Sequence, residues 1–253
     1  TGSLNSGDAF DCDVNGDEIY DPETERFYYV SDYYNASTKL FEDDTAVLIY
    51  YNNVSSGNPN NNTKSSYDSS GENWHGPRTA ITQLPTTSQW NNVSLKNISR
   101  TILNENSSNI TTGGTLPNKF SYEGYSSRLI TIQEVRKAAH NDNIPIWKVG
   151  ELDDYNYFVE NTSFSSPNGR NLAYWLETPC SDSSSFAFGV YGHNRNVGSN
   201  DVPHLGVYSV RPVIEVSNKN IDCLFTVANN YPNSFWGTLG SYRIYQYTME
   251  ISE

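Results

Sequence analysis

The residues best suited to nucleophilic or metal chemistry are scattered along the chain and form no catalytic motif. The three cysteines, Cys12, Cys180 and Cys223, include no CxxC pair, and an odd number leaves at least one thiol unpaired. The four histidines lie in no HExxH pattern, and there is no GxSxG elbow, phosphate loop or dinucleotide fingerprint. We therefore expect a protein that is not an enzyme. The sequence does not decide whether Cys12 and Cys223 form a disulfide.

One acidic stretch, Asp11–Asp21, alternates oxygen-bearing side chains around a glycine, as a loop that binds a hard cation does. The candidate ligands are Asp11, Asp13, Asn15 and Asp17. The twelfth loop position is Pro22 or Thr24, depending on the starting residue, so neither register supplies the glutamate that completes an EF-hand. We expect a turn that displays carboxylates, with a weak Ca²⁺ site as the alternative, and no required cofactor.

The net charge disfavours two classes of binding partner. The formal net charge is -13 and the chain has no cluster of Lys or Arg, which argues against nucleic acid or an anionic membrane surface. Aromatic residues make up 13% of the chain, which favours a folded core over disorder. No stretch is long and apolar enough to cross a bilayer. We expect membrane attachment only through an anchor that this sequence lacks.

The most unusual stretch is Cys180–Ser209, called the window below. It contains no Lys, Glu, Gln, Met or Trp, and every residue type in it has a codon that ends in a pyrimidine. Its aromatic residues suit ligand contact, and its Ser, Gly and Asn residues suit adaptable hydrogen bonding. The predicted contact residues are Asp182, Phe186, Phe188, Tyr191, His193, Asn194, Asn196, Asn200, Asp201, His204 and Tyr208. A plain surface loop, or a core role for Phe186 or Phe188, is the alternative.

Two hydrophobic segments frame the window. YWLETP precedes it and VRPVIEV follows it, and we expect both to be buried strands that fix its ends. The predicted scaffold residues are Trp175, Arg211 and Pro212. Arg211 and Glu177 are expected to pair, or to cap the edges of the window.

The aromatic and β-branched runs predict further strands. Arg26–Tyr34 and Thr45–Tyr51 are expected to pair antiparallel across a polar connection. The polar stretch 52–73 predicts a long loop. Near the C-terminus, Ile221–Val227 and Ser241–Ile251 are expected to extend a sheet.

Two segments carry helix signals. One helix is expected to begin after Pro85, with Trp90 turned inward. The other lies in Arg128–Ala139, where Thr131 and Glu134 have the spacing of a capping box.

The order of these segments resembles a known family. LPTTSQW, RLITIQEVRKAA, YWLETP, a Gly/Asn-rich span and VRPVIEV follow one another as in the C-type lectin fold of the formylglycine-generating-enzyme type. The form they resemble most is the ligand-binding domain of variable proteins from diversity-generating retroelements, in a pilin-like secreted form. There, randomised template adenines convert Asn codons into the pyrimidine-ending set found in the window. The match departs at GVYSVRPV, which lacks the usual Gly before VRP, and residues 221–253 match nothing in the family.

The resemblance implies an α+β protein with a C-type lectin fold, two helices, short antiparallel strands, much irregular loop and β extensions at both ends. It implies a pilin-like β-hairpin segment at 1–75 packed on a lectin-like domain at 76–217, with the variable region at 171–216. A C-terminal β extension follows at 218–253.

The resemblance also implies a function, which is ligand binding by a hypervariable receptor or adhesin. The expected partner is an unknown protein or glycan on another cell or phage. The expected place is extracellular or at a cell surface, on a pilus or a virion. The alternatives are a structural pilin or adhesin subunit with a stabilising calcium loop, and an enzyme of the formylglycine-generating type with Cys180 as its nucleophile.

Overall fold

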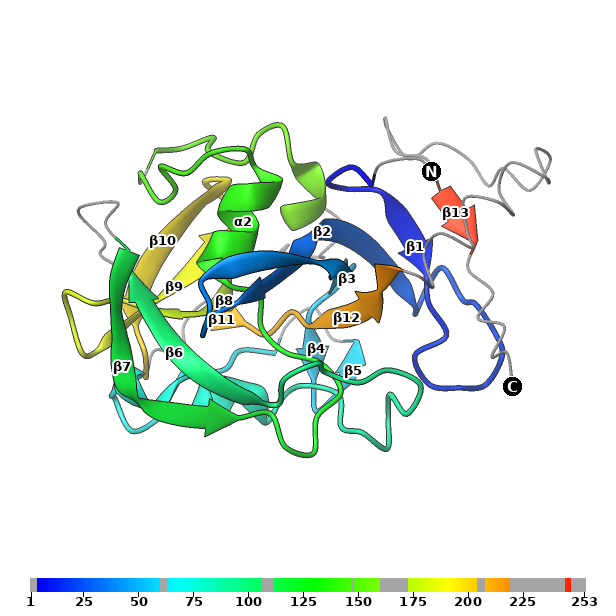
Figure 1. Cartoon of the computed structure of the whole chain (residues 1–253), viewed down its shortest axis with the longest axis horizontal. Coiled ribbons are helices and arrows are strands. Elements are labelled where there is room, and N and C mark those ends of the chain that lie inside the picture. Colours follow the sequence, from blue (N-terminus) through cyan, green and yellow to red (C-terminus); the bar gives the residue numbers. More distant parts are fainter. Residues whose placement is uncertain are drawn as a thin grey trace.

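The computed structural model describes residues 4–59, 63–105, 112–146, 148–159, 173–203, 208–218 and 244–246. Within them the chain is mostly sheet with two short α-helices, an α+β arrangement (Figure 1). The strands are β1 (Ala9–Asp11), β2 (Arg26–Asn35), β3 (Leu40–Tyr50), β4 (Val54–Ser55), β5 (Asn58–Pro59), β6 (Ser99–Glu105), β7 (Thr112–Ser121), β8 (Ala173–Pro179), β9 (Phe186–Tyr191), β10 (Asn196–Asp201), β11 (Tyr208–Ser209), β12 (Val213–Ser217) and β13 (Ile244–Gln246). The helices are α1 (Arg78–Ile81) and α2 (Ile132–Ala138), with 3-10 turns η1 (Asn73–His75) and η2 (Asn156–Phe158).

The larger sheet has the strand order β12-β3-β2-β1-β13. Its centre is the antiparallel pair β2 and β3, which confirms the strand pair predicted from the sequence. The predicted connection between them was too long, because Glu42, Asp43 and Asp44 belong to β3 and the turn is only residues 36–39. The first half of β3 faces solvent, and Lys96 lies 2.7 Å from both Glu42 and Asp44, so the strand tolerates these carboxylates.

This sheet joins strands from the two ends of the described chain. β12 pairs antiparallel with β3, with Ile214 opposite Leu48, and β13 pairs parallel with β1. The predicted strand Ser241–Ile251 contains β13, whereas Ile221–Val227 lies outside the described residues. The predicted strand VRPVIEV and part of Ser241–Ile251 therefore lie in one sheet with the β2–β3 pair.

The smaller sheet has the strand order β10-β9-β8-β11 and contains the window. Every residue of β8 is buried, because a hydrophobic cluster covers each face of the sheet. Trp175 belongs to the cluster that holds Phe27 and Trp90, and its neighbour Leu176 belongs to the cluster that holds Val135 of α2. Helix α2 also packs on β2, so it joins the two sheets (Figure 1).

Helix α2 begins as the sequence predicts. The Thr131 hydroxyl accepts from the Glu134 N–H at 3.2 Å, and the Glu134 carboxylate accepts from the Thr131 N–H at 3.0 Å. Ile132, Val135 and Ala139 are buried on one face, as expected from their spacing. Local sequence therefore determines this helix, and packing on both sheets stabilises it.

The prediction of a helix after Pro85 is wrong. Residues 86–90 form a single turn, in which the Trp90 N–H donates to the Thr86 carbonyl at 3.0 Å. Thr86 also bridges Tyr125 as an isolated β-pair, which holds the start of this segment extended. Trp90 is 7% exposed, so its predicted inward direction is confirmed.

Replacing the capping residue tests how much the α2 start contributes. Thr131→Ala removes the acceptor for one N–H of the first turn, and we expect the free energy of unfolding to fall by about 1 kcal/mol. Urea unfolding measures the difference. Thr38→Ala, in the exposed β2–β3 turn, is the control and should change little. Equal losses in the two variants would contradict the capping role.

Candidate ligand-binding site

The window forms a β-hairpin with a loop before it. Residues 180–185 form the loop, β9 and β10 form the hairpin, and residues 192–195 form its turn. Phe186 lies opposite Asp201, and Tyr191 lies opposite Asn196. His204 lies outside the described residues. The described part of the window is thus integral to the smaller sheet rather than a plain surface loop.

Burial corrects three of the predicted contact residues. Phe188 and Tyr208 are 0% exposed and Asn196 is 5% exposed, so none of them can offer its side chain to a ligand. Phe188 packs in the cluster beneath α2. Tyr208 stacks on Trp175 with 3.8 Å between ring centroids. These residues are core because both faces of their sheet are covered.

Gly189 allows Tyr208 to lie across the sheet. A Cβ at position 189 would be 2.3 Å from the Tyr208 ring and 2.7 Å from the Tyr174 carbonyl oxygen. Any side chain there would push Tyr208 away from Trp175. Gly189 and Tyr208 are therefore structural residues inside the window.

The other predicted contact residues in the described part of the window are exposed or half-buried, and they lie at opposite ends of the hairpin. The loop-end surface contains Asp182, Phe186 and Asp201. The turn-end surface contains Tyr191, His193 and Asn194, and the Asn200 side chain hydrogen-bonds to that of Tyr191 on the same face of the hairpin. The length of β9 separates the main chain of the loop from that of the turn by about 16 Å, at 3.3 Å per residue. A small ligand therefore cannot contact both the loop and the turn.

One amide outside the window holds the backbone of the loop end. The Asn73 side-chain nitrogen lies 2.8 Å from the Cys180 carbonyl oxygen and 2.6 Å from that of Ser183. It also lies 2.7 Å from the Phe186 carbonyl oxygen, and the Asn73 main-chain N–H donates to Ser184 at 2.6 Å. All four acceptors are main-chain atoms, so these bonds do not depend on which side chains the loop carries.

Segment 65–67 holds the other half of the loop end. The Tyr67 N–H donates to the Val202 carbonyl at 2.9 Å, and the Ser66 hydroxyl donates to the Pro203 carbonyl at 3.1 Å. The Trp175 indole N–H donates to the Ser65 carbonyl at 2.7 Å, which ties this segment to β8. The sequence showed only a polar loop at 52–73. Its single aromatic residue, the buried Tyr67, was the available signal that part of this loop packs on the core.

The turn end is held in the same way. The Gly150 N–H donates to the Asn194 carbonyl and the Leu152 N–H to the Arg195 carbonyl, both at 2.9 Å. The Glu151 carboxylate accepts from the Val197 N–H at 3.0 Å. The Arg195 side chain adds a contact of its own, with its guanidinium 2.9 Å from Asp153. The backbone of the turn is therefore fixed from outside the window.

The predicted pairing of Arg211 with Glu177 is wrong. Arg211 is fully buried and donates to three main-chain carbonyls at 2.6 to 2.8 Å, those of Tyr50, Tyr157 and Phe158. Glu177 instead lies 3.0 Å from Arg100 on β6. Burial lowers the pKa of Arg211, and the three carbonyls compensate for its lost hydration. Trp175 and Pro212 are also buried, so the ends of the window are fixed inside the core.

The two described thiols are poorly suited to catalysis. Cys12 and Cys180 are buried, and burial raises the pKa of Cys180 to about 12. The nucleophilic form of cysteine is the thiolate, which is scarce at neutral pH when the pKa is so high. Cys223 lies outside the described residues, so its bridge to Cys12 stays untested.

The acidic stretch brings together a different set of carboxylates from the predicted one. Asp13, Asp17 and Glu25 each offer an oxygen within 4.8 Å of the others, an arrangement that could hold a cation. Asp11 instead pairs with Arg26, and Asn15 donates to Asp17 at 3.0 Å. Glu25 lies one position beyond the twelfth residue counted from Asp13, which is why the EF-hand spacing missed it.

Comparisons with known proteins identify no relative, so the function has to be inferred from the geometry of the site. A scan against protein-family models, a search of curated proteins and a search of solved structures each found no match. Among the described residues, no helix has the length and apolar character needed to cross a membrane.

The raised pKa of Glu25 predicts how the free energy of unfolding depends on pH. Burial, together with repulsion from Asp13 and Asp17, raises the pKa of Glu25 from 4.5 to about 7. The folded chain holds this proton more tightly than the unfolded chain, so the stabilisation is full below about pH 4.5 and is lost as the pH rises to about 7. We expect Glu25→Gln to match the parent at pH 4 and to exceed its free energy of unfolding by about 1–2 kcal/mol at pH 8.

Denaturant unfolding across this pH range measures the effect. The exposed Glu23→Gln variant is the control and should show no crossover. A constant difference between Glu25→Gln and the parent at all pH values would contradict the assignment. Melting the parent at pH 8 with Ca²⁺ and with a chelator checks the cation alternative, because an unchanged midpoint eliminates a structural ion.

Removing the Asn73 side-chain amide tests whether this amide anchors the loop end of the window. Asn73→Ala removes the donor to the Cys180 and Ser183 carbonyls, whereas the Phe186 carbonyl still accepts from the Cys180 N–H at 3.0 Å. We expect the free energy of unfolding to fall by about 2–4 kcal/mol. Amide hydrogen exchange should accelerate in residues 181–186. The exposed Asn58→Ala, which removes a single local bond to Ser56, is the control. A similar loss in both variants would show that the amide does not hold the loop.

Proposed function

We propose that the chain is a non-catalytic recognition protein whose ligand is contacted by the exposed side chains of the window. The observation that carries this proposal is the anchoring of the window through its main chain. Asn73, Tyr67 and Gly150 donate hydrogen bonds to main-chain carbonyl groups of the window. The exposed side chains can therefore change while the backbone that presents them stays in place.

The exposed side chains at each end include an aromatic residue and polar neighbours. Phe186 is half-buried at the loop end and Tyr191 is half-buried at the turn end, each beside exposed polar groups. Such a combination gives a ligand a rigid apolar contact together with adaptable hydrogen bonds. Among the contact residues predicted at the start, the described ones that keep this role are Asp182, Phe186, Tyr191, His193, Asn194, Asn200 and Asp201.

The proposal includes the C-type lectin fold of the diversity-generating-retroelement variable proteins. The restricted alphabet of the window and the order of the framing motifs support it. On this proposal the partner is a protein or glycan on another cell or phage, and the chain is displayed outside the cell, on a pilus or a virion.

Two alternative functions would use other residues of the chain. A structural pilin or adhesin subunit with a calcium loop is compatible with the carboxylate cluster at Asp13, Asp17 and Glu25. An enzyme of the formylglycine-generating type is disfavoured, because its candidate nucleophile, Cys180, is a buried thiol with a raised pKa.

Substitutions within the window separate the recognition role from the core. Replacing Asp182, His193 and Asp201 together by Ser should change the free energy of unfolding by no more than about 0.5 kcal/mol at each site. Phe188→Ala should cost about 3–5 kcal/mol, because it opens a cavity in the core. Urea unfolding measures both. If the exposed triple variant unfolds, the window is core throughout and the proposal fails.

The same positions test recognition itself. A displayed library that varies only the exposed window residues should yield binders to unrelated proteins or glycans, whereas a library of equal size at Gly189 and Tyr208 should yield mostly unfolded chains. The flanking DNA is an independent check. A near-repeat of the window that differs at adenines, beside a reverse transcriptase, is the expected arrangement.

A further inference from the structure

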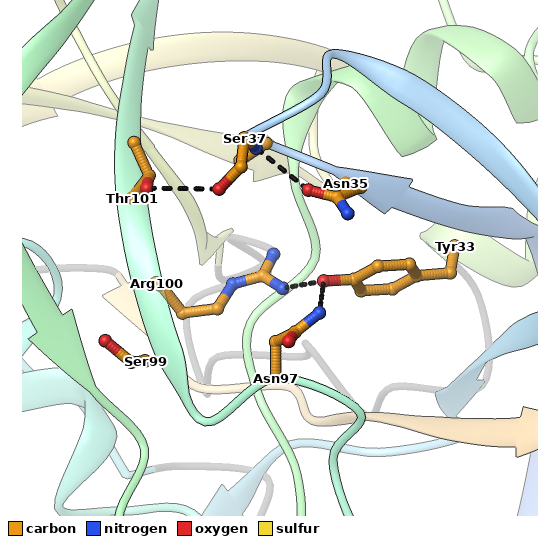
Figure 2. Close-up of a pocket in the computed structure, with 8 residues that line it drawn as sticks. Tyr33, Asn35, Ser37, Asn97, Ser99, Arg100 and Thr101 are labelled. Atoms are coloured by element: carbon orange, nitrogen blue, oxygen red, sulfur yellow. Dashed lines mark hydrogen bonds between the residues drawn. The ribbon is translucent and has the colours of Figure 1, made fainter.

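A pocket of about 270 Å³ lies between the β2–β3 turn and β6 (Figure 2). None of the residues that line it belongs to the window. All but one of them, Ala36, carry a hydroxyl, amide or guanidinium group. The pocket is therefore a polar site separate from the proposed recognition surfaces, and nothing inferred from it depends on them.

The floor of the pocket is built around the Tyr33 hydroxyl. Arg100 donates to it from Nη1 at 2.8 Å, and Asn97 donates to it from Nδ2 at 3.0 Å. Figure 2 shows these two side chains meeting at Tyr33, with Ser37 and Thr101 across the pocket and joined by a hydrogen bond of 3.4 Å. Tyr33 and Arg100 are almost fully buried, so this floor is preformed.

The groups that a ligand can reach lie on the exposed rim of the pocket. Arg100 is 2% exposed and bonds to Tyr33 and Glu177, so it shapes the floor and does not serve as a donor to a ligand. The side chains of Ser37, Asn97 and Ser99 are exposed. A hydroxyl group both donates and accepts and an amide oxygen accepts, so these side chains suit a ligand group that itself donates and accepts.

The cations around the pocket are already paired. The Arg100 guanidinium lies 3.0 Å from Glu177. Lys96 and Arg128, which like Arg100 lie 5.5 to 5.6 Å from the centroid of the Tyr33 ring, each contact two carboxylates. No unpaired positive charge is thus presented to an anion by these three residues, and the net charge of -13 further disfavours one.

We propose that this pocket binds a neutral polyhydroxylated ligand of the size of one sugar residue. A ligand hydroxyl group donates and accepts, so it matches the exposed serine hydroxyls and the Asn97 oxygen together. A volume of this size holds several waters, which a ring carrying several hydroxyls can displace. With Ala36 as the one apolar lining residue, the pocket does not suit an apolar ligand.

The test is a titration of the full chain with neutral methyl glycosides, followed by amide chemical shifts, with inorganic phosphate as a parallel arm. We expect shifts at Ser37, Asn97 and Thr101 with millimolar sugar and none with phosphate. Ser99→Tyr, an exposed strand position at the pocket, should abolish the shifts by filling the site. Asn97→Ala should weaken binding by about tenfold, because it removes one hydrogen-bond acceptor.

A matched variant separates this site from the window. Ser184→Tyr places the same side chain on the exposed loop of the window and should leave sugar binding unchanged. Loss of binding in Ser184→Tyr would assign the sugar to the window and overturn the pocket proposal, as would shifts with phosphate alone or none with any glycoside. Thermal melting checks that Ser99→Tyr is folded, and Asn97→Ala decides the outcome if it is not.

Discussion

The main-chain groups of the window must stay hydrogen-bonded even if its side chains vary. A buried carbonyl or N–H without a partner costs about 1–3 kcal/mol, and a domain of this kind has only about 5–15 kcal/mol in total. The loss of two or three such bonds would thus approach the whole stability. Asn73 and segments 65–67 and 150–152 remove this risk, because they supply partners from outside the window. The freedom of the exposed side chains depends on this arrangement.

Buried charges fix the same framework from inside. Arg128 is fully buried and contacts Glu134 at the start of α2 and Glu215 on β12, with both distances 2.6 Å. Arg100 joins β6 to β8 through Glu177. Removing one member of such a pair leaves an unpaired buried charge, which typically costs about 3–5 kcal/mol. Glu134 also completes the capping box, so one carboxylate marks the start of α2 and links it through Arg128 to Glu215 on β12.

The sequence predicted correctly the elements that depend on residues close together in the chain. The capping box of α2 and the pairing of β2 with β3 follow from residues close in sequence. The sequence left a core role for Phe188 open, and the structure decides for it, whereas the burial of Tyr208 was not predicted. Both depend on tertiary packing that covers the two faces of the sheet, which local patterns do not report. The three-carbonyl contact of Asn73 spans more than a hundred residues, and no spacing rule reports it.

The geometry also bears on the size of the proposed ligand. The loop and the turn at the two ends of the window are about 16 Å apart, and β10, at the edge of its sheet, runs between them. A single sugar residue is too short to contact both, whereas an oligosaccharide or a protein surface laid along β10 reaches both. A ligand of one sugar residue would therefore leave one end of the window without contacts, and variation there would not affect binding. A ligand that spans the window would make binding depend on Asp182 and His193 together, so the pattern of sensitive positions reports the extent of the bound ligand before it is identified.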